Sequence, residues 1–421
     1  MDVQSGSSNS APLTAGIARL KVLVLDEEIP FPLNSGKRIR TWNLLRNLAE
    51  KHSITFVCYG TRDDPAFAAM ERLGIQVVPI AGLPAANSSS FYAGAAANLF
   101  SFWPYSVARH YTRRYRNAVR QLMASERYDL VHCEWTPYAS YVGATGGVPI
   151  VIMAHNIEAT VWRRRAEHAP SIAERLYMKL QAAKMARFEK NSFALATRVV
   201  TVTEEERQTA NAWGARATSL VSNGVDTEYL QLIPEATEPN SLLFLGSLDW
   251  QPNRDALQYL LREILPRIQT VKPDAKLRIV GRQPATKLRE QVGGMHGVDW
   301  VGEVPDIRPW FAQAAAVLVP LRIGGGSRIK ILESLSMAKA VVTTTIGAEG
   351  LDVVSGEHCL IADTPAEFAE CVAHLLHHPE RADELGRNGR NLVVRQYDWS
   401  RLAQNLEDAW RETTRMPPIG A

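Results

Sequence analysis

A run of glycines ahead of a helix is the part of this 421-residue chain whose residue types point most directly to chemistry. An apolar strand expected to end at Leu321 leads into three consecutive glycines, 324–326. Ser327 is placed to cap a helix that begins near Arg328. Glycines let a ligand approach the backbone, and the first N–H groups of a helix attract phosphate through their partial positive charge. The segment therefore predicts a site for a phosphate-bearing ligand.

Two charged residues on the same helix extend this site. Lys330 and Glu333 are three residues apart and share one face of the helix, whereas Ile329, Leu332 and Leu335 can form the opposite, buried face. A cation close to phosphates and a carboxylate one turn further suit a nucleoside diphosphate, because the carboxylate can accept hydrogen bonds from both ribose hydroxyls. The alternative is a flexible glycine turn followed by a solvated ion pair, and neither a P-loop nor a GxGxxG pattern is matched.

The elements that must position these residues follow from an alternation of short apolar runs with helix-length stretches. In the first half, strands are expected at 21–25, 54–57, 77–80, 130–133, 150–153 and 199–202. In the second half, strands are expected at 242–245, 277–280, 317–321 and 341–344, with helices near 256–268, 329–337 and 367–376. Apolar runs buried on both faces that alternate with helices indicate parallel, doubly wound sheets. The polar stretch 223–241, which contains two prolines, is expected to be a linker.

Composition and charge exclude several classes of protein. Apolar residues make up 46% of the chain and charged residues 22%, which is typical of a folded globular protein and excludes a fibrous or largely disordered chain. The net charge of +3 is too small to indicate nucleic-acid binding. Four cysteines without a CxxC pattern suggest neither a zinc site nor a disulfide framework, so we expect a cytoplasmic protein. Residues 1–17 resemble a disordered tail and not a signal peptide, and no run reaches the ~18 apolar residues that span a bilayer.

Several stretches together resemble the family 4 glycosyltransferases of the GT-B fold. The nucleotide-sugar-binding segment of that family is similar to GGGSRIKILESLSMAKAVVTT followed by IGAEGL. Further similarity lies in LLFLGSLDWQPNRDAL, LRIVGR, VDWVGEVPDIRPWFAQAAAVLVP, SNGVD and AHN, which occur in the order that the family shows. The resemblance covers about residues 20–412. It implies two doubly wound, Rossmann-like domains that face each other across a cleft: an acceptor-side domain at 18–232 with a C-terminal helix at about 398–415, and a donor-binding domain at 233–397.

The same resemblance implies roles for residues of the second domain. Glu333 matches the second glutamate of the family's E-x(7)-E motif, which holds the donor ribose, but the first glutamate would fall at Gly325. The chain therefore resembles the subgroup that carries only K-x-x-E. The family's G-R-L-x-x-x-K-G is GSLDWQPN here, with Ser247 and Pro252 at the two basic positions. The donor phosphates must then be met elsewhere, and the nearest basic candidates are Arg328, Lys330 and Arg282.

The remaining donor-site candidates also come from the resemblance. Val301 and Gly302 match a strand end whose backbone contacts the base, with a plain buried strand end as the alternative. Glu349 lies in the loop beside the ribose and donor sugar, with a surface position as its alternative. The glycines and the serine of the donor site complete the set: Gly36 in the first loop, Gly246, Gly325, Gly326 and Ser327. In the first loop, Lys37 or Arg38 is also expected to meet donor phosphate or acceptor.

His155 is the catalytic candidate of the first domain. It follows directly on the expected strand 150–153 and so lies at the edge of the sheet that faces the cleft. In the family an equivalent histidine approaches the transferred sugar, whereas a structural histidine is the alternative, and structural roles are favoured for Asn156 and Glu158. We list His155, Lys330 and Glu333 as catalytic. No close carboxylate pair and no D-x-D after a strand is found, so neither a metal nor a cofactor is expected, and the resemblance implies retention of the anomeric configuration.

A basic and aromatic region follows in the first domain. Residues 101–190 contain 14 Lys and Arg against 7 Asp and Glu, a local excess of +7. Phe100, Phe102, Trp103 and Tyr105 adjoin a group of arginines at 109, 113, 114 and 116. Aromatic and basic residues together favour an anionic membrane surface, whereas a solvated helix face over buried aromatics is the alternative.

The sequence and the resemblance thus predict a retaining, metal-independent hexosyltransferase. It would move a sugar from a nucleotide-diphosphate sugar to a glycan acceptor, expected to be lipid-linked, in bacterial-type surface polysaccharide synthesis. Expected partners are the nucleotide-sugar donor, the glycan or lipid-linked acceptor and the cytoplasmic face of a membrane, without nucleic acid. A soluble small-molecule acceptor remains open, and so does a non-catalytic nucleotide-binding subunit.

Overall fold

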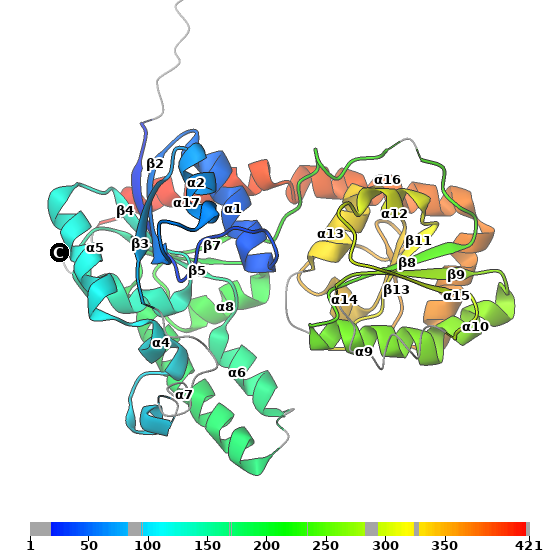
Figure 1. Cartoon of the computed structure of the whole chain (residues 1–421), viewed down its shortest axis with the longest axis horizontal. Coiled ribbons are helices and arrows are strands. Elements are labelled where there is room, and N and C mark those ends of the chain that lie inside the picture. The colour runs from blue at the N-terminus through cyan, green and yellow to red at the C-terminus, as the bar shows by residue number, and fades with distance from the viewer. Residues whose placement is uncertain are drawn as a thin grey trace, which may run out of the picture.

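Two parallel sheets with helices on both faces make up the protein (Figure 1). The computed structural model describes residues 18–82, 94, 96–167, 169, 171–233, 235–282, 294–323 and 328–417. The expected α/β architecture with two doubly wound domains is confirmed. Of the expected site residues, Gly325, Gly326 and Ser327 lie outside the described residues.

The first sheet has seven strands in the order β3-β2-β1-β4-β5-β6-β7. Its strands are β1 Lys21–Leu25, β2 Ser53–Tyr59, β3 Gln76–Ile80, β4 Leu130–Cys133, β5 Ile150–Ala154, β6 Arg198–Thr201 and β7 Thr218–Leu220. The helices of this part are α1 Gly36–Ala49, α2 Pro65–Arg72, η1 Asn98–Phe100, α4 Tyr105–His110, α5 Arg113–Ser125, η2 Thr136–Ala144, α6 Glu158–Glu167, α7 Ile172–Leu195 and α8 Glu204–Ala212. Each pair of neighbouring strands is parallel, so all the strand carboxyl ends lie at one edge.

The second sheet has six strands in the order β10-β9-β8-β11-β12-β13. Its strands are β8 Ser241–Leu245, β9 Lys276–Val280, β10 Val298–Gly302, β11 Ala316–Val319, β12 Val341–Thr343 and β13 Leu360–Ile361. The helices are α9 Gln251–Tyr259, η3 Leu260–Ile264, α10 Leu265–Val271, α12 Arg308–Gln313, α13 Ile329–Ser336, α14 Thr345–Ala348, α15 Pro365–His377 and α16 Pro379–Gln396. Helices α13 and α16 pack together, as do α10 and α15 on the other side of the sheet (Figure 1).

Burial on both faces explains why the apolar runs were recognisable as strands. Every residue of β4, β5, β6, β8, β11 and β12 is buried, so these strands carry no polar alternation. The expected strands are all present, with ends that differ by at most two residues. The short edge strands β7 and β13 were not predicted, because three and two half-exposed residues leave no apolar run to detect.

The last helix, α17 Trp399–Thr414, belongs to the core of the first domain although α16 before it packs on the second. Its buried residues Trp399, Leu402, Leu406 and Trp410 join the core that contains α1, which α17 contacts along its length. At its start, Asp398 caps the helix through Ser400 and accepts a hydrogen bond from the Thr227 hydroxyl at 2.6 Å. The two connections between the domains therefore run side by side.

Helices α6 and α7 form an antiparallel hairpin that projects from the first domain, away from the body of its sheet (Figure 1). Ser171 caps the start of α7 by accepting a hydrogen bond from the Glu174 amide. The buried carboxylate of Glu189 accepts the backbone N–H groups of Glu158 and Ala159, which ties α7 to the start of α6. The hairpin is thus anchored at its base by backbone hydrogen bonds to one carboxylate.

Candidate active site

A cleft of about 1150 Å³ lies between the two domains. Its walls are the segments that follow the strands at their carboxyl ends, which is where open α/β sheets bind ligands. The cleft is lined by eight of the expected site residues: Gly36, His155, Gly246, Arg282, Arg328, Lys330, Glu333 and Glu349. Six of these come from the second domain and two from the first. The structure therefore brings together residues that are up to 313 positions apart in the chain, from Gly36 to Glu349.

Val301 and Gly302 are placed differently from the other candidates. They end β10, and neither belongs to the cleft lining, whereas the next residues, Glu303 and Val304, do. The carbonyl of Gly302 accepts the amide of Gly281 at 2.8 Å, so this end of the strand is held by backbone pairing. A contact of this strand end with a base stays a prediction.

Lys330 is held in place by an amide from a neighbouring helix. Its Nζ donates to Oδ1 of Asn253 on α9, and the Nδ2 of Asn253 donates to the carbonyl of Ser247 at 2.8 Å. Burial lowers the pKa of Lys330 to about 8, against the opposing effect of Glu333 and together with that of Arg328. The ammonium group therefore sits in the cleft with a neutral amide as its hydrogen-bond partner.

Glu333 is half-buried one turn along α13, with no hydrogen bond or ion pair of its carboxylate within the described residues. Burial raises the pKa of Glu333 to about 7, and the charge of Lys330 opposes this shift only in part. A carboxylate that is removed from water and lacks donors is costly, so the arrangement favours a ligand that brings hydroxyl donors.

Two glycines allow the strand ends and Lys330 to lie close together. A Cβ atom at Gly246 would lie 2.9 Å from Nδ2 of Asn253 and 3.3 Å from Nζ of Lys330. A Cβ atom at Gly281 would lie 1.9 Å from the carbonyl oxygen of Gly246. Glycine is therefore required by packing at both Gly246 after β8 and Gly281 after β9, and it also allows a ligand to approach the backbone there.

The two arginines of the second domain are engaged differently. Nη2 of Arg282 donates to the carbonyl of Asn34 in the first domain at 3.1 Å, which bridges the cleft. Nη2 of Arg328 forms an ion pair with Glu349 at 2.9 Å, and burial lowers the pKa of Arg328 while Glu349 opposes this. Arg328 occupies the N-cap position of α13. Glu349 therefore lies in the cleft as the partner of an arginine and not at an isolated surface position.

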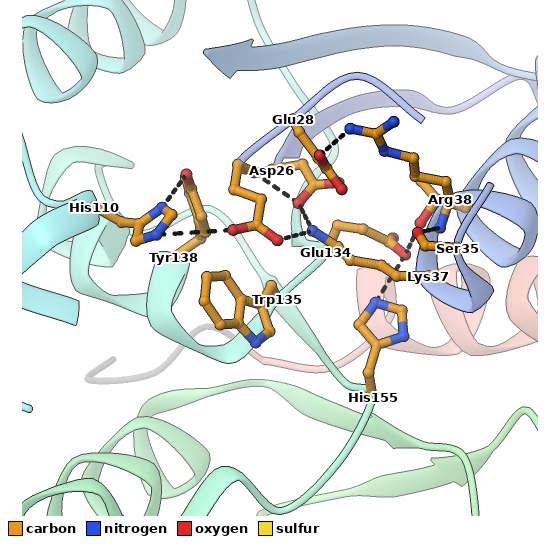
Figure 2. A network of polar contacts seen from close by, with 12 residues as sticks. Asp26, Glu28, Ser35, Lys37, Arg38, His110, Glu134, Trp135, Tyr138 and His155 are labelled. Carbon is orange, nitrogen blue, oxygen red and sulfur yellow. Dashed lines mark hydrogen bonds and ion pairs between the residues drawn. The ribbon is translucent and has the colours of Figure 1, made fainter. Parts of the chain in front are cut away.

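The first loop places Gly36 at the start of α1, where Ser35 caps the helix by accepting the amide of Arg38. The expected use of Lys37 or Arg38 for phosphate meets competition from carboxylates (Figure 2). Nζ of Lys37 lies 2.5 Å from Asp26 and 2.9 Å from Glu27, while Arg38 pairs with Glu28. Burial lowers the pKa of Lys37, but the two carboxylates outweigh it and raise that pKa overall. These cations are already neutralised before any ligand binds.

His155 lies directly after β5 and lines the cleft with 11% of its side chain exposed. Burial lowers its pKa, against the effect of the nearby carboxylate of Glu134, so the imidazole is neutral near pH 7. Its companion Glu158 accepts a hydrogen bond from Nε1 of Trp135 at 2.9 Å, which is the structural role that was favoured for it. Asn156 also lines the cleft.

Sequence reasoning missed three residues of this region: Asn253, Arg40 and Glu134. Arg40 is fully buried on α1, lines the cleft and donates to the carbonyls of Val221 and Ser222, which holds the start of the linker. Glu134 follows β4 just as His155 follows β5. The rule that located His155, a polar residue directly after a buried strand, applies equally to Glu134 and could have found it.

Within the described residues, no group of three or more His, Cys, Asp or Glu side chains is arranged to hold a metal ion. In the same part of the chain, none of the helices combines the length and the apolar character needed to cross a membrane.

Two family models match consecutive parts of the chain. Residues 35–229 match the model described as Glycosyltransferase Family 4, and residues 239–378 match the model described as Glycosyl transferases group 1. The first match lies in the first domain and the second in the second domain, and together they cover well over half of the chain.

Similar proteins and structures agree with these matches. The phosphatidyl-myo-inositol mannosyltransferase of Mycobacterium leprae is 31% identical over 195 residues, which are 44% of this chain and 51% of that protein. An uncharacterized 44.6 kDa protein in the cps region of Klebsiella pneumoniae is 21% identical over 401 residues, 92% of this chain and 98% of that protein. Anabaena HepE, solved with UDP and glucose, superimposes with a TM-score of 0.64 at 14% identity, over 94% of this chain and 100% of that chain, and shows the GT-B fold.

The raised pKa of Glu333 predicts how Glu333→Gln changes stability with pH. Because the folded pKa of about 7 exceeds the ordinary 4.5, wild-type stability falls as pH rises through this window, and the loss is complete above pH 7. The Gln side chain does not ionise, so Glu333→Gln does not lose stability as the pH rises. We therefore expect its free energy of unfolding to match that of wild type near pH 4 and to exceed it by about 1–2 kcal/mol at pH 8. This figure already allows for the partial exposure of the side chain to water. Urea unfolding at both pH values measures the difference.

Glu370→Gln, at an exposed position on α15, is the matched control and should show no such pH dependence. If the difference in stability between Glu333→Gln and wild type is the same at pH 4 and pH 8, the pKa of Glu333 is not raised and the interpretation is wrong.

Proposed function

Since the chain belongs to the GT-B glycosyltransferases, we propose that it transfers a sugar, with retention of configuration and without a metal ion, from a nucleotide-diphosphate sugar to a glycan acceptor. The observation that carries the proposal is the pair Lys330 and Glu333, which lie one helical turn apart and both line the cleft between the domains; the Glu333 carboxylate has no hydrogen-bond partner within the described residues.

The nucleotide fits this pair by charge. The ribose hydroxyls would donate to the Glu333 carboxylate, which restores the hydrogen bonds that burial has removed. The diphosphate would meet Lys330, the start of α13 and Arg282, since helix amides and basic side chains stabilise the charge that develops on a leaving diphosphate. This arrangement supplies positive charge without a metal, and UDP in the complex of Anabaena HepE supports a nucleoside diphosphate as ligand.

The transferred sugar would lie between the diphosphate and His155 of the opposite domain. A neutral imidazole can exchange hydrogen bonds with sugar hydroxyls without adding charge beside the departing diphosphate. Retention would follow from attack on the same face as the leaving group, as the similarity to family 4 glycosyltransferases suggests.

A lipid-linked sugar is the proposed acceptor, in the synthesis of a bacterial-type surface polysaccharide. Support comes from the names of two similar proteins, a phosphatidyl-myo-inositol mannosyltransferase and a protein of a cps region. A soluble acceptor is the competing possibility. Binding of the protein to a membrane would favour the lipid-linked acceptor over the soluble one.

The structure shows which residues of the basic and aromatic region are exposed. Of its aromatic residues, Phe100 and Phe102 are 92% and 85% exposed, whereas Trp103 is half-buried with its ring edge-on to Tyr111. The segment with Phe100 is joined to α7, because Lys184 donates to the carbonyls of Asn98 and Leu99. On α7 an exposed apolar stripe continues with Ile172, Leu176 and Leu180, interleaved with the exposed cations Arg175 and Lys179. We propose that this patch contacts an anionic membrane on its cytoplasmic face.

Loss of either charged group of the pair should weaken donor binding. Lys330→Ala and Glu333→Ala should each reduce the affinity for the preferred nucleoside diphosphate sugar at least tenfold, because each removes a charged hydrogen bond worth roughly 1.5–3 kcal/mol. A thermal-shift screen of nucleoside diphosphates and their sugars identifies the ligand, and calorimetry of wild type and variants measures the affinity. Lys276→Ala, at the opposite end of β9, is the control. Unchanged affinity in both variants refutes the site.

Mechanism and metal independence can be tested in one reaction. With the preferred donor and acceptor and an excess of EDTA, we expect activity to persist and NMR of the first-formed linkage to show the anomeric configuration of the donor. The physical reason is that basic side chains and helix amides carry the charge of the leaving group. Inversion of configuration, or an activity that returns only with added Mg²⁺, contradicts the proposal.

Membrane contact should be reversible and sensitive to salt. The protein should co-sediment with vesicles rich in anionic lipid at low ionic strength and be released near 1 M salt, where the Debye length falls to about 3 Å. Phe100→Ser with Phe102→Ser, and separately Arg175→Glu with Lys179→Glu, should abolish sedimentation and leave donor affinity unchanged. Val394→Ser, an exposed apolar position on α16, is the control. Absence of vesicle binding at any salt, with full activity on a water-soluble acceptor, favours the soluble acceptor instead.

A further inference from the structure

The carboxylate of Glu134 lies next to the candidate catalytic imidazole. Glu134 follows β4 and His155 follows β5, and these strands are parallel neighbours, with Cys133 level with Ile152. Nε2 of His155 is 3.3 Å from Oε1 of Glu134 (Figure 2). The Glu134 side chain is only 2% exposed, so the two groups interact where little water screens them.

A second histidine fixes the other oxygen of this carboxylate. Nε2 of His132 lies 2.8 Å from Oε2 of Glu134, and Nε1 of Trp410 lies 3.1 Å from Nδ1 of the same ring. An indole N–H can only donate, so Nδ1 of His132 accepts and the ring proton is on Nε2, which donates to Glu134. The tryptophan comes from α17, so the C-terminal helix reaches the support of this site.

The carboxylate is charged and still has capacity for one more donor. Oγ1 of Thr41 donates to its Oε1 at 2.8 Å, beside the bond from His132 to Oε2. Burial would raise the pKa of Glu134, but His132 and His155 outweigh it and hold that pKa well below the ordinary value. Oε1 can accept a second hydrogen bond, and Nε2 of His155 lies 3.3 Å from it.

On the His155 ring, Nε2 is buried and lies 3.3 Å from Oε1 of Glu134, without a completed hydrogen bond within the described residues. Of the two neutral tautomers, the one with hydrogen on Nε2 places a donor beside the carboxylate. The other tautomer points a lone pair at a negative charge, which is electrostatically unfavourable in a site of low dielectric.

We propose that Glu134 is a positioning residue for His155, holding the imidazole in the tautomer with hydrogen on Nε2 so that Nδ1 accepts a hydrogen bond from a hydroxyl of the transferred sugar. This inference rests on the proposed function only for the identity of the hydroxyl. The hydrogen bonds from Trp410 to His132 and from His132 to Glu134 fix the carboxylate. In this proposal a small rotation of the His155 ring completes the bond to Glu134, because the two atoms are already 3.3 Å apart.

The first test reads the tautomer directly and needs no activity. In the full chain labelled with ¹⁵N-histidine, long-range ¹H–¹⁵N correlation should show His155 with hydrogen on Nε2, the signal being assigned by its absence in His155→Gln. In Glu134→Gln the preference for this tautomer should be lost. Hydrogen on Nδ1 in wild type, or an unchanged tautomer in Glu134→Gln, overturns the proposal.

The second test separates positioning from a structural role. Glu134→Gln should lower kcat at least tenfold with a change in donor KM of less than twofold, and Glu134→Asp should recover part of the loss. Glu189→Gln, which removes another buried carboxylate of the first domain, is the matched control and should retain wild-type kcat. A Glu134→Gln variant that changes only KM, or that retains kcat, contradicts the assignment.

If wild type showed the expected tautomer but transferred no sugar from any donor, the proposed function would fail while the positioning by Glu134 would stand. If Glu134→Gln failed to fold, Thr41→Val, which removes one donor to the carboxylate, would provide the kinetic comparison. It should lower kcat by a smaller factor than Glu134→Gln, and a kcat equal to that of wild type would count against the proposal.

Discussion

The partial burial of Lys330 and Glu333, without full pairing of their charges among the described residues, is the constraint on which the chemistry of this cleft depends. Burial favours the neutral form of each group: it lowers the pKa of Lys330 to about 8 and raises the pKa of Glu333 to about 7. A protein that gained nothing from this arrangement would be more stable with uncharged residues there. The cost is offset when a ligand supplies a phosphate to one group and hydroxyl donors to the other.

In the first domain, by contrast, the charged groups beside the cleft are paired with one another. The two walls of the cleft therefore differ in what they can offer a ligand. Lys37 is fully satisfied by Asp26 and Glu27, so the first loop has no unpaired cation of this kind to offer a diphosphate. What this wall presents instead is the neutral ring of His155, backed by Glu134 and, through His132, by Trp410 of α17. The return of the chain to the first domain thus supports the site as well as the core.

Much of this could be predicted from the sequence, because strands buried on both faces are continuous apolar runs. The end of an expected strand then placed His155 at the cleft, whereas Gly246 and Arg282 came from the resemblance to family 4 glycosyltransferases; all three line the cleft. The polar contacts of the two arginines could not be predicted, since their partners are distant in sequence. Arg328 meets Glu349 across 21 positions, and Arg282 meets a carbonyl 248 positions away in the other domain. The base contact expected at Val301 and Gly302 stays a prediction: these residues end β10 and do not line the cleft, whereas Glu303 and Val304 after them do.

A crystal structure of the protein with its preferred nucleoside diphosphate tests the central claim most directly. The account predicts that the ribose hydroxyls lie within 3.2 Å of the Glu333 carboxylate, as hydrogen bonds require, and that the diphosphate contacts Lys330 at the start of α13. A nucleotide bound elsewhere, or one in the cleft with its ribose turned away from Glu333, would contradict it.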